Sequence, residues 1–146
     1  MLAAMKHLAD LTLGCQLVTP RRGFTHHGIY AGDGQVVHYA GLARAWRRGP
    51  VELVSLEDFA GGRDVWIEPT PCARYAGLHA VARALSRLGE DQYRIATNNC
   101  EHFCAWCLDG VGRSRQIEHF FAAWPRVAAH AMLALCLFGS LGNLLQ

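Results

Sequence analysis

Cys100 is the first of three cysteines that helical spacing places on one face, together with Cys104 and Cys107. A free thiol has a pKa of about 8.5, so a catalytic cysteine needs help to lose its proton at neutral pH. The sequence predicts that Asn98 or Asn99 caps a helix beginning near Cys100, where backbone N–H groups favour negative charge. These groups are also candidate donors to the oxyanion of a tetrahedral intermediate. Cys100 is therefore a candidate nucleophile for acyl chemistry, whereas Cys104 and Cys107 are expected to face the core.

Three histidines flank a predicted β-hairpin in the stretch HHGIYAGDGQVVHYAG. The hairpin is indicated by Asp33-Gly34 between two apolar runs. Alternate residues of a strand share a face, so His26 and His27 point to opposite sides of the sheet. A three-residue turn places His26 on the face of His38, whereas a two-residue turn places His27 there. The residues leave both registers open, and either imidazole is a candidate base for the thiol.

The elements that must position these residues indicate an α+β fold. Short strand-like stretches separated by turn residues predict an antiparallel sheet; they are CQLVT, FTHHGIYAG, QVVHYAG, VELVSL and VWIEPT. Apolar residues at helical spacing predict a helix over 75–88, which Gly89 ends. A second helix is predicted from near Cys100 to Gly110, and a short one over residues 1–13.

The composition excludes several function classes. A formal net charge of +2 gives no basis for a nucleic-acid partner, and arginines such as Arg21 and Arg22 are interpreted as a solvated rim. Six cysteines without a secretory signal favour a reducing compartment and a cytoplasmic location. The C-x3-C-x2-C spacing and the nearby His102 and His119 match neither an iron–sulfur site nor a zinc site well. We therefore expect no metal and no cofactor.

The C-terminal segment 127–145 carries no Asp, Glu, Lys or Arg. About 20 apolar residues are needed to cross a bilayer, and polar residues within this segment make it a poor span. Two interpretations stay open: association with a membrane surface, or an apolar helix that packs on the domain or on a second copy as a homodimer. We expect a catalytic domain over 1–124, with its core at about 13–110, and an apolar helix over 125–146.

Two motifs resemble those of the LRAT-like (lecithin:retinol acyltransferase) family of the permuted papain-like superfamily. The histidine block resembles the family pattern H-(W/H)-x-I-Y-x-G-D-G-x-V-x-H, and NNCEHF resembles N-C-E-H-F. They occur in the family's order, with the histidines before the cysteine. The resemblance covers Leu13 to about Leu108. Two positions depart from it, because Cys15 stands where the family often has an acidic residue and His27 replaces the common tryptophan.

The resemblance implies an antiparallel sheet with packed helices in a circularly permuted papain-like arrangement. It implies Cys100 as nucleophile, His26 as general base and His38 as the polar group that orients the base, which favours the three-residue turn. Residues expected to support the site are His27, Tyr30, Asn99, Glu101 and His102. The implied activity is acyl transfer or hydrolysis on an acyl lipid, through a cysteine thioester. A cysteine peptidase or amidase, and a non-catalytic binding module that keeps the fold, are the alternatives.

Overall fold

The computed structural model describes residues 11–41 and 49–123. The helix predicted over 1–13 and the apolar segment 127–145 therefore lie almost entirely outside the described residues. The chain divides into two compact units that meet between Ser114 and Arg115, and each is considered by itself. Within the described ranges, no helix combines the length and the apolar character needed to cross a membrane.

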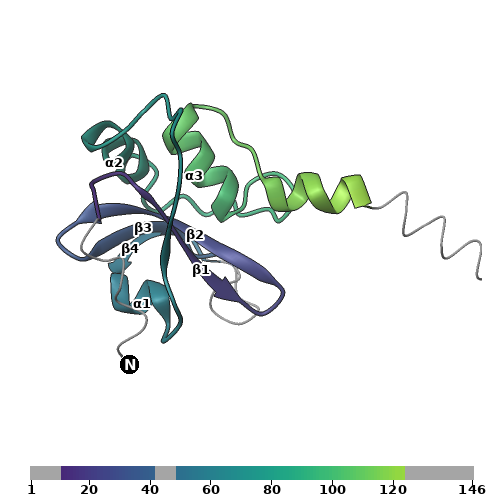
Figure 1. Cartoon of the computed structure of the whole chain (residues 1–146), viewed down its shortest axis with the longest axis horizontal. Helices are drawn as coiled ribbons and strands as arrows, with labels where there is room; N and C mark the ends of the chain where they lie inside the picture. The colour runs from purple at the N-terminus through teal and green to yellow at the C-terminus, as the bar shows by residue number, and fades with distance from the viewer. Residues whose placement is uncertain (1–10, 42–48, 124–146) are drawn as a thin grey trace, which may run out of the picture. The chain divides into compact units, whose positions relative to one another are not determined.

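A five-stranded antiparallel sheet forms the centre of the first unit (Figure 1). The strands lie in the order β4-β3-β2-β1-β5. Their bounds are β1 Gln16–Arg21, β2 Phe24–Gly32, β3 Gln35–Tyr39, β4 Val51–Ser55 and β5 Trp66–Glu68. Each strand coincides with one of the predicted strand-like stretches, so the predicted antiparallel sheet and the α+β class are confirmed.

The β2–β3 hairpin sets the register of the candidate site. Both turn residues have positive φ, 48° for Asp33 and 68° for Gly34, as a tight two-residue hairpin turn requires. A β-bulge between Tyr30 and Gly32 then shifts the pairing, so that Gly28 lies opposite His38. A two-residue turn combined with a bulge thus produces the pairing that the sequence assigned to a three-residue turn.

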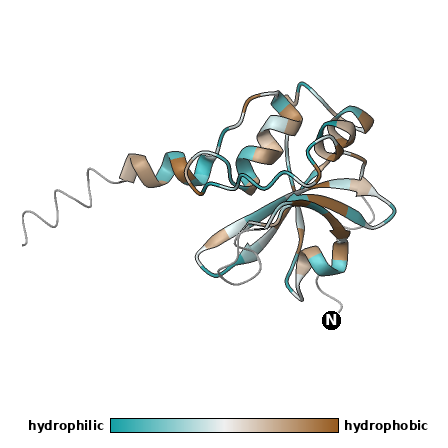
Figure 2. Ribbon diagram, turned by 180° about the vertical axis from the view of Figure 1, so that it is seen from behind, coloured by the Kyte–Doolittle hydropathy of each residue, from teal (hydrophilic) through white to brown (hydrophobic). Residues whose placement is uncertain are grey.

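The helices cover both faces of the sheet (Figure 1). Helices α2 (Leu78–Leu85) and α3 (Cys100–Asp109) cover one face, in an apolar cluster that includes Ile29 and Phe103. The short α1 (Leu56–Ala60) packs on the other face. Figure 2 shows hydrophobic residues along the central strands, between these layers. The centre of the sheet is therefore covered on both faces, and the residues there are shielded from water.

Two helices differ from the sequence-based expectation. Helix α2 is shorter than the predicted 75–88, because Gly77 has φ 55° and ψ −135° and cannot extend the helix backwards. Helix α1 was not predicted. Its signal is local: the side chain of Ser55 accepts a hydrogen bond from the backbone N–H of Asp58, and Gly61 ends the helix with a left-handed φ of 56°.

Candidate active site

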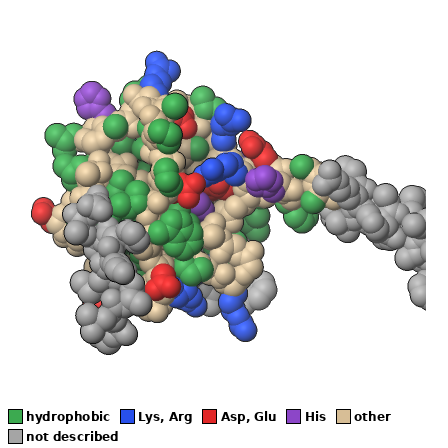
Figure 3. All heavy atoms as spheres, in the orientation of Figure 1, with side chains coloured by type: hydrophobic (Ala, Val, Ile, Leu, Met, Phe, Trp, Pro, Cys, Tyr) green, Lys and Arg blue, Asp and Glu red, His purple; other side chains and the backbone are tan. Residues whose placement is uncertain are grey.

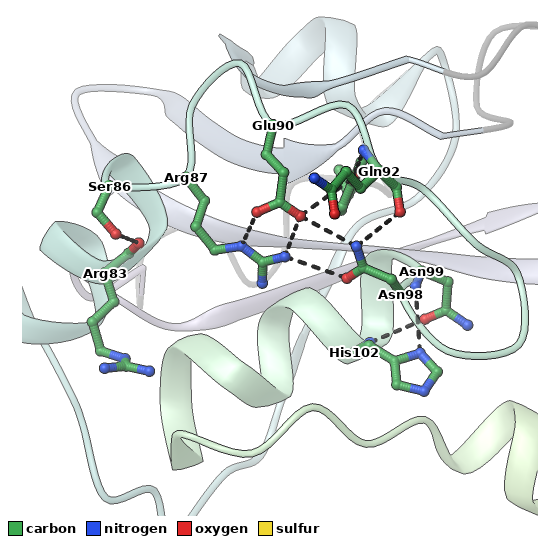
Figure 4. A network of polar contacts seen from close by, with 9 residues as sticks. Arg83, Ser86, Arg87, Glu90, Gln92, Asn98, Asn99 and His102 are labelled. Carbon is green, nitrogen blue, oxygen red and sulfur yellow. Dashed lines mark hydrogen bonds and ion pairs between the residues drawn. The ribbon is translucent and has the colours of Figure 1, made fainter.

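Cys100 is the first residue of α3, and Asn99 caps that helix as predicted. The Asn99 Oδ1 atom accepts hydrogen bonds from the backbone N–H groups of Glu101 and His102, both at 3.0 Å. The backbone N–H of Asn99 in turn donates to His102 Nδ1 at 3.4 Å, which completes a capping box (Figure 4). The cap fixes where the helix begins, and so fixes the position of the thiol.

All three cysteines of α3 are buried. Cys104 and Cys107 are completely inaccessible to solvent, which confirms that they face the core, and Cys100 is 2% exposed. Burial raises the pKa of the Cys100 thiol to about 11, although a backbone hydrogen bond from His27 opposes the shift. The thiol is therefore protonated at neutral pH, and a base must remove its proton when it reacts.

The thiol lies against the beginning of β2. Its Sγ atom donates to the backbone carbonyl of Thr25 at 3.9 Å, and the backbone of His27 also interacts with the sulfur. These two backbone groups lie on either side of His26. The structure thus brings the start of the late helix to the strand of the early hairpin. The sulfur interacts with the backbone of this strand and with the backbone of Cys100 and Glu101 at the start of α3.

His26 and His38 form a buried pair on the α1 face of the sheet. The distance between His26 Nε2 and His38 Nδ1 is 2.8 Å, and the His26 ring is 1% exposed. Phe59 of α1 packs against both rings, at centroid distances of 5.3 Å and 5.7 Å. Burial, followed by the charges of His38 and Arg21, lowers the pKa of His26 well below its usual value, so its imidazole is neutral at neutral pH.

His27 points away from the α1 face, to the face of the sheet that α2 and α3 cover. On that face, Cys100 and Ile29 belong to the same apolar cluster. Both of its ring nitrogens have side-chain partners: Nδ1 lies 2.8 Å from Gln16 Nε2, and Nε2 lies 2.9 Å from Thr25 Oγ1. Because the Gln16 amide nitrogen is a donor, the lone pair of His27 Nδ1 is already used. His27 is therefore less suited than His26 to accept a proton.

Arg21 corrects one interpretation from the sequence, since it is not part of a solvated rim. It is partly buried, and its guanidinium donates to the backbone carbonyls of Phe59 at 2.6 Å and Ala60 at 3.3 Å. Its charge interacts with both His26 and Cys100. A fixed cation thus lies near both groups, where it opposes protonation of the imidazole and favours a thiolate.

A polar network holds the loop before Cys100 (Figure 4). Arg87 forms an ion pair with Glu90, and both residues contact the side chain of Asn98. The Asn98 Nδ2 atom also donates to the carbonyl of Gln92 at 2.9 Å. Sequence reasoning missed Arg87 and Glu90, since their only local signal is a charge pair three residues apart in the turn that follows α2.

The other predicted supporting residues have structural contacts. The Tyr30 hydroxyl accepts from the backbone N–H of Gly34 at 3.2 Å and braces the hairpin turn. Glu101 is 6% exposed, and it accepts a hydrogen bond from the Ser114 hydroxyl at 2.6 Å. Ser114, which sequence reasoning missed, connects the end of the first unit to the start of α3.

The surface view in Figure 3 shows basic and acidic side chains interspersed on the visible face, without a large field of one sign. This distribution agrees with the small net charge of the chain, +2. A surface of this kind has no electrostatic footprint for a polyanion on that face.

The fold and the candidate site define an α+β protein in which a buried cysteine at a helix N-terminus contacts a strand that carries a buried histidine pair. The chain belongs to the lecithin retinol acyltransferase family, whose model matches residues 9–113.

Three relatives illustrate the similarity. Phospholipase A and acyltransferase 2 of Homo sapiens is 31% identical over 145 residues, and the match covers 88% of this chain and 89% of the relative. Phospholipase A and acyltransferase 3 of Homo sapiens is 29% identical, with 80% and 81% covered. Lecithin retinol acyltransferase of Rattus norvegicus is 29% identical, and the match covers 73% of this chain but 58% of that longer protein.

Proposed function

We propose that this protein is a thiol-dependent acyltransferase or hydrolase that takes an acyl group from a lipid ester or amide and holds it as a thioester on Cys100. Family membership and the names of the relatives, phospholipase A and acyltransferase and lecithin retinol acyltransferase, support a lipid acyl donor. The observation that carries the proposal is the contact of the Cys100 sulfur with the strand segment that bears the buried His26–His38 pair.

His26 is the general base in this proposal, and it acts through Nδ1. Its ring lies on the α1 face of the sheet, whereas the Cys100 sulfur approaches the same strand from the α3 side at Thr25, so the proposal requires the thiol and the ring to meet around the start of β2. The Nε2 atom of His26 is used in the hydrogen bond to His38, and within the described part of the chain no hydrogen bond engages its Nδ1. An imidazole that donates from Nε2 has its lone pair on Nδ1, which is the form that accepts a proton. The lowered pKa of His26 keeps that form populated at neutral pH.

The first step begins from a neutral thiol and a neutral imidazole. As Sγ of Cys100 attacks the acyl carbonyl carbon, His26 Nδ1 takes the thiol proton and the carbonyl oxygen becomes an oxyanion. The intermediate collapses to the thioester, the bond to the alcohol or amine of the donor breaks, and the imidazolium returns its proton to that leaving group. A lipid donor thereby loses one acyl chain.

The second step repeats this chemistry with an acceptor. Water, an alcohol or an amine attacks the thioester carbonyl while His26 removes its proton, and the thiolate leaves and is reprotonated by the imidazolium. Water gives hydrolysis, whereas an alcohol or amine gives acyl transfer. The exclusion of water from the acyl-enzyme decides the ratio of the two products.

Fewer backbone N–H groups of α3 are available to bind the oxyanion than the sequence suggested. The side chain of Asn99 already binds the N–H groups of Glu101 and His102, and the N–H of Phe103 donates to the carbonyl of Asn99. Among the first N–H groups of α3, the proposal therefore assigns the oxyanion to the backbone N–H of Cys100.

The proposal also covers the bounds of the catalytic domain and the place where it acts. We propose a catalytic domain over 1–124, supported by the family match to residues 9–113; the unit boundary after Ser114 falls ten residues before the proposed end. A lipid substrate favours action at a membrane surface. Any contribution of 127–145 to membrane association or to a homodimer is a separate proposal. Vesicle flotation and sedimentation of the full chain, compared with a chain ending at residue 124, test it.

The function is tested with phospholipid vesicles that carry a labelled acyl chain. We expect the wild-type protein to release lysophospholipid, with the acyl chain recovered as free acid or on an added amine. Cys100→Ala should abolish both products, and the matched variant Cys104→Ala, which removes a buried thiol one helical turn away, should retain them. Product formation by Cys100→Ala, or no lipid product with the wild-type protein, would contradict the proposal.

A further inference from the structure

A carboxylate lies at the far end of the histidine pair. Glu52 of β4 is directly opposite His38 of β3 in the sheet, so the two side chains share a face. Glu52 Oε1 and His38 Nε2 are 3.3 Å apart, which is within ion-pair distance although the two atoms are not aligned as a hydrogen bond, and both atoms are buried. The three side chains therefore form a continuous line from His26 through His38 to Glu52, and this line crosses three neighbouring strands.

The position of the protons along this line decides whether His26 can act as a base. If His38 carries its proton on Nε2, toward Glu52, then its Nδ1 accepts from His26 Nε2, and His26 Nδ1 is unprotonated. If His38 instead carries its proton on Nδ1, it donates to His26 Nε2, and the proton of His26 must then lie on Nδ1. The second arrangement blocks the nitrogen that would receive the thiol proton.

We propose that Glu52 is a positioning residue that selects the productive tautomers of His38 and His26, by accepting the proton that His38 presents on Nε2. An ionised carboxylate is an acceptor only, so it favours the first arrangement over the second. Its negative charge also stabilises the imidazolium that forms when the thiol proton leaves, as in other carboxylate–imidazole pairs. This inference rests on the proposed function, and it adds a residue that neither the motifs nor the resemblance indicated.

Among residues 11–41 and 49–123, the other charged groups considered near the pair do not supply this acceptor. Arg21 of β1 is a cation, and its charge opposes the imidazolium. On α1, which packs against β3 and β4, the acidic residues are Glu57 and Asp58; both are exposed, and Asp58 accepts a hydrogen bond from Ser55. In the part of the chain that the structure describes, the carboxylate within ion-pair distance of His38 is that of Glu52.

The first test is kinetic and uses Glu52→Gln, which keeps the size of the side chain and removes its charge. The matched control is Glu57→Gln on the surface of α1. With a labelled phospholipid, we expect Glu52→Gln to lower kcat by about 10- to 100-fold, the range for losing a hydrogen bond to a charged group, with little change in KM. Glu52→Asp, which keeps the charge, should recover part of the loss, and Glu57→Gln should match the wild type.

The pH profile separates positioning from a merely structural role. Removing a negative charge beside an imidazole lowers the pKa of that imidazole. The acidic limb of the kcat profile should therefore move to lower pH in Glu52→Gln. A structural defect would reduce the amount of active protein and leave the limb in place. An unchanged kcat and an unchanged limb would overturn the inference.

A spectroscopic test does not depend on turnover. Nitrogen-15 shifts of the imidazoles report which ring nitrogen carries the proton, and we expect His38 to be protonated on Nε2 and His26 on Nε2 in the wild-type protein. In Glu52→Gln, a second population with His38 protonated on Nδ1 should appear. If the nitrogen-15 shifts show the same tautomers in both proteins, the role of Glu52 is refuted whatever the activity. If the wild-type protein forms no lipid products in the vesicle assay, the proposed function alone is refuted.

Discussion

The buried, neutral state of His26 has a consequence for stability that can be measured without a substrate. The ring is 1% exposed, and burial together with His38 and Arg21 lowers its pKa well below the usual value. In the unfolded chain the same imidazole titrates at about pH 6.5. Below that pH the unfolded state binds a proton that the folded state does not bind, so stability falls as pH falls.

The size of the effect follows from this linkage. If native His26 stays neutral, acidification from about pH 7.5 to about pH 5.5 removes about 1.4 kcal/mol from the free energy of unfolding through this residue. The matched variant is His26→Gln, whose amide N–H can still donate to His38 Nδ1 but does not titrate. All other titrating groups are common to the two proteins. The wild-type protein should therefore lose about 1.4 kcal/mol more than the variant over this interval.

Urea unfolding followed by tryptophan fluorescence gives the free energy of unfolding of each protein at both pH values. The loss between the two pH values is then compared for the wild type and the variant, provided that the denaturant slope is the same for both proteins. The absolute stability of His26→Gln does not matter, because the pH dependence alone is compared. Equal losses in the two proteins would mean that native His26 gains its proton as readily as the unfolded chain does. The account of His26 as a buried neutral base would then be wrong.

Three further outcomes follow from the structure. Asn99→Ala removes the cap of α3 and should lower the free energy of unfolding by about 1–2 kcal/mol, whereas Asn99→Ser should lose less; equal losses would rule out the cap as the cause. Gly28→Ala places a Cβ 2.6 Å from Val36 and 2.9 Å from Phe59, so we expect a loss of about 1–3 kcal/mol in chemical denaturation, and wild-type stability would contradict the packing described. Cys104→Ala should cost about 1 kcal/mol in the same measurement and leave the rate of lipid deacylation unchanged, and a large loss of rate would assign that thiol a role in the chemistry.

The sheet and α3 could be predicted because their signals are local. Alternating apolar residues marked the strands, and an asparagine before the cysteine with Gly110 after the last turn marked both ends of α3. The burial of Cys104 and Cys107 followed from helical spacing alone. In each case, neighbouring residues in the chain carry the information.

The contacts within the site are long-range and could not be read in the same way. The bulge between Tyr30 and Gly32 shifts the register by one residue, and turn chemistry alone does not reveal it. Glu52 meets His38 because two strands pair at that position, and Arg21 reaches carbonyls of α1, an element that was not predicted. The lowered pKa of His26 likewise depends on burial by residues that are distant in sequence.

The central claim is that His26, rather than His27, removes the proton of the Cys100 thiol. Rapid-quench mass spectrometry of the intact protein with an activated acyl ester measures this step, and digestion then locates the adduct. We expect the acyl group on the peptide that contains Cys100, with a rate that His26→Gln lowers by about 100-fold or more and His27→Gln changes much less. An adduct that forms equally fast in His26→Gln, or that lies on another residue, would contradict the account.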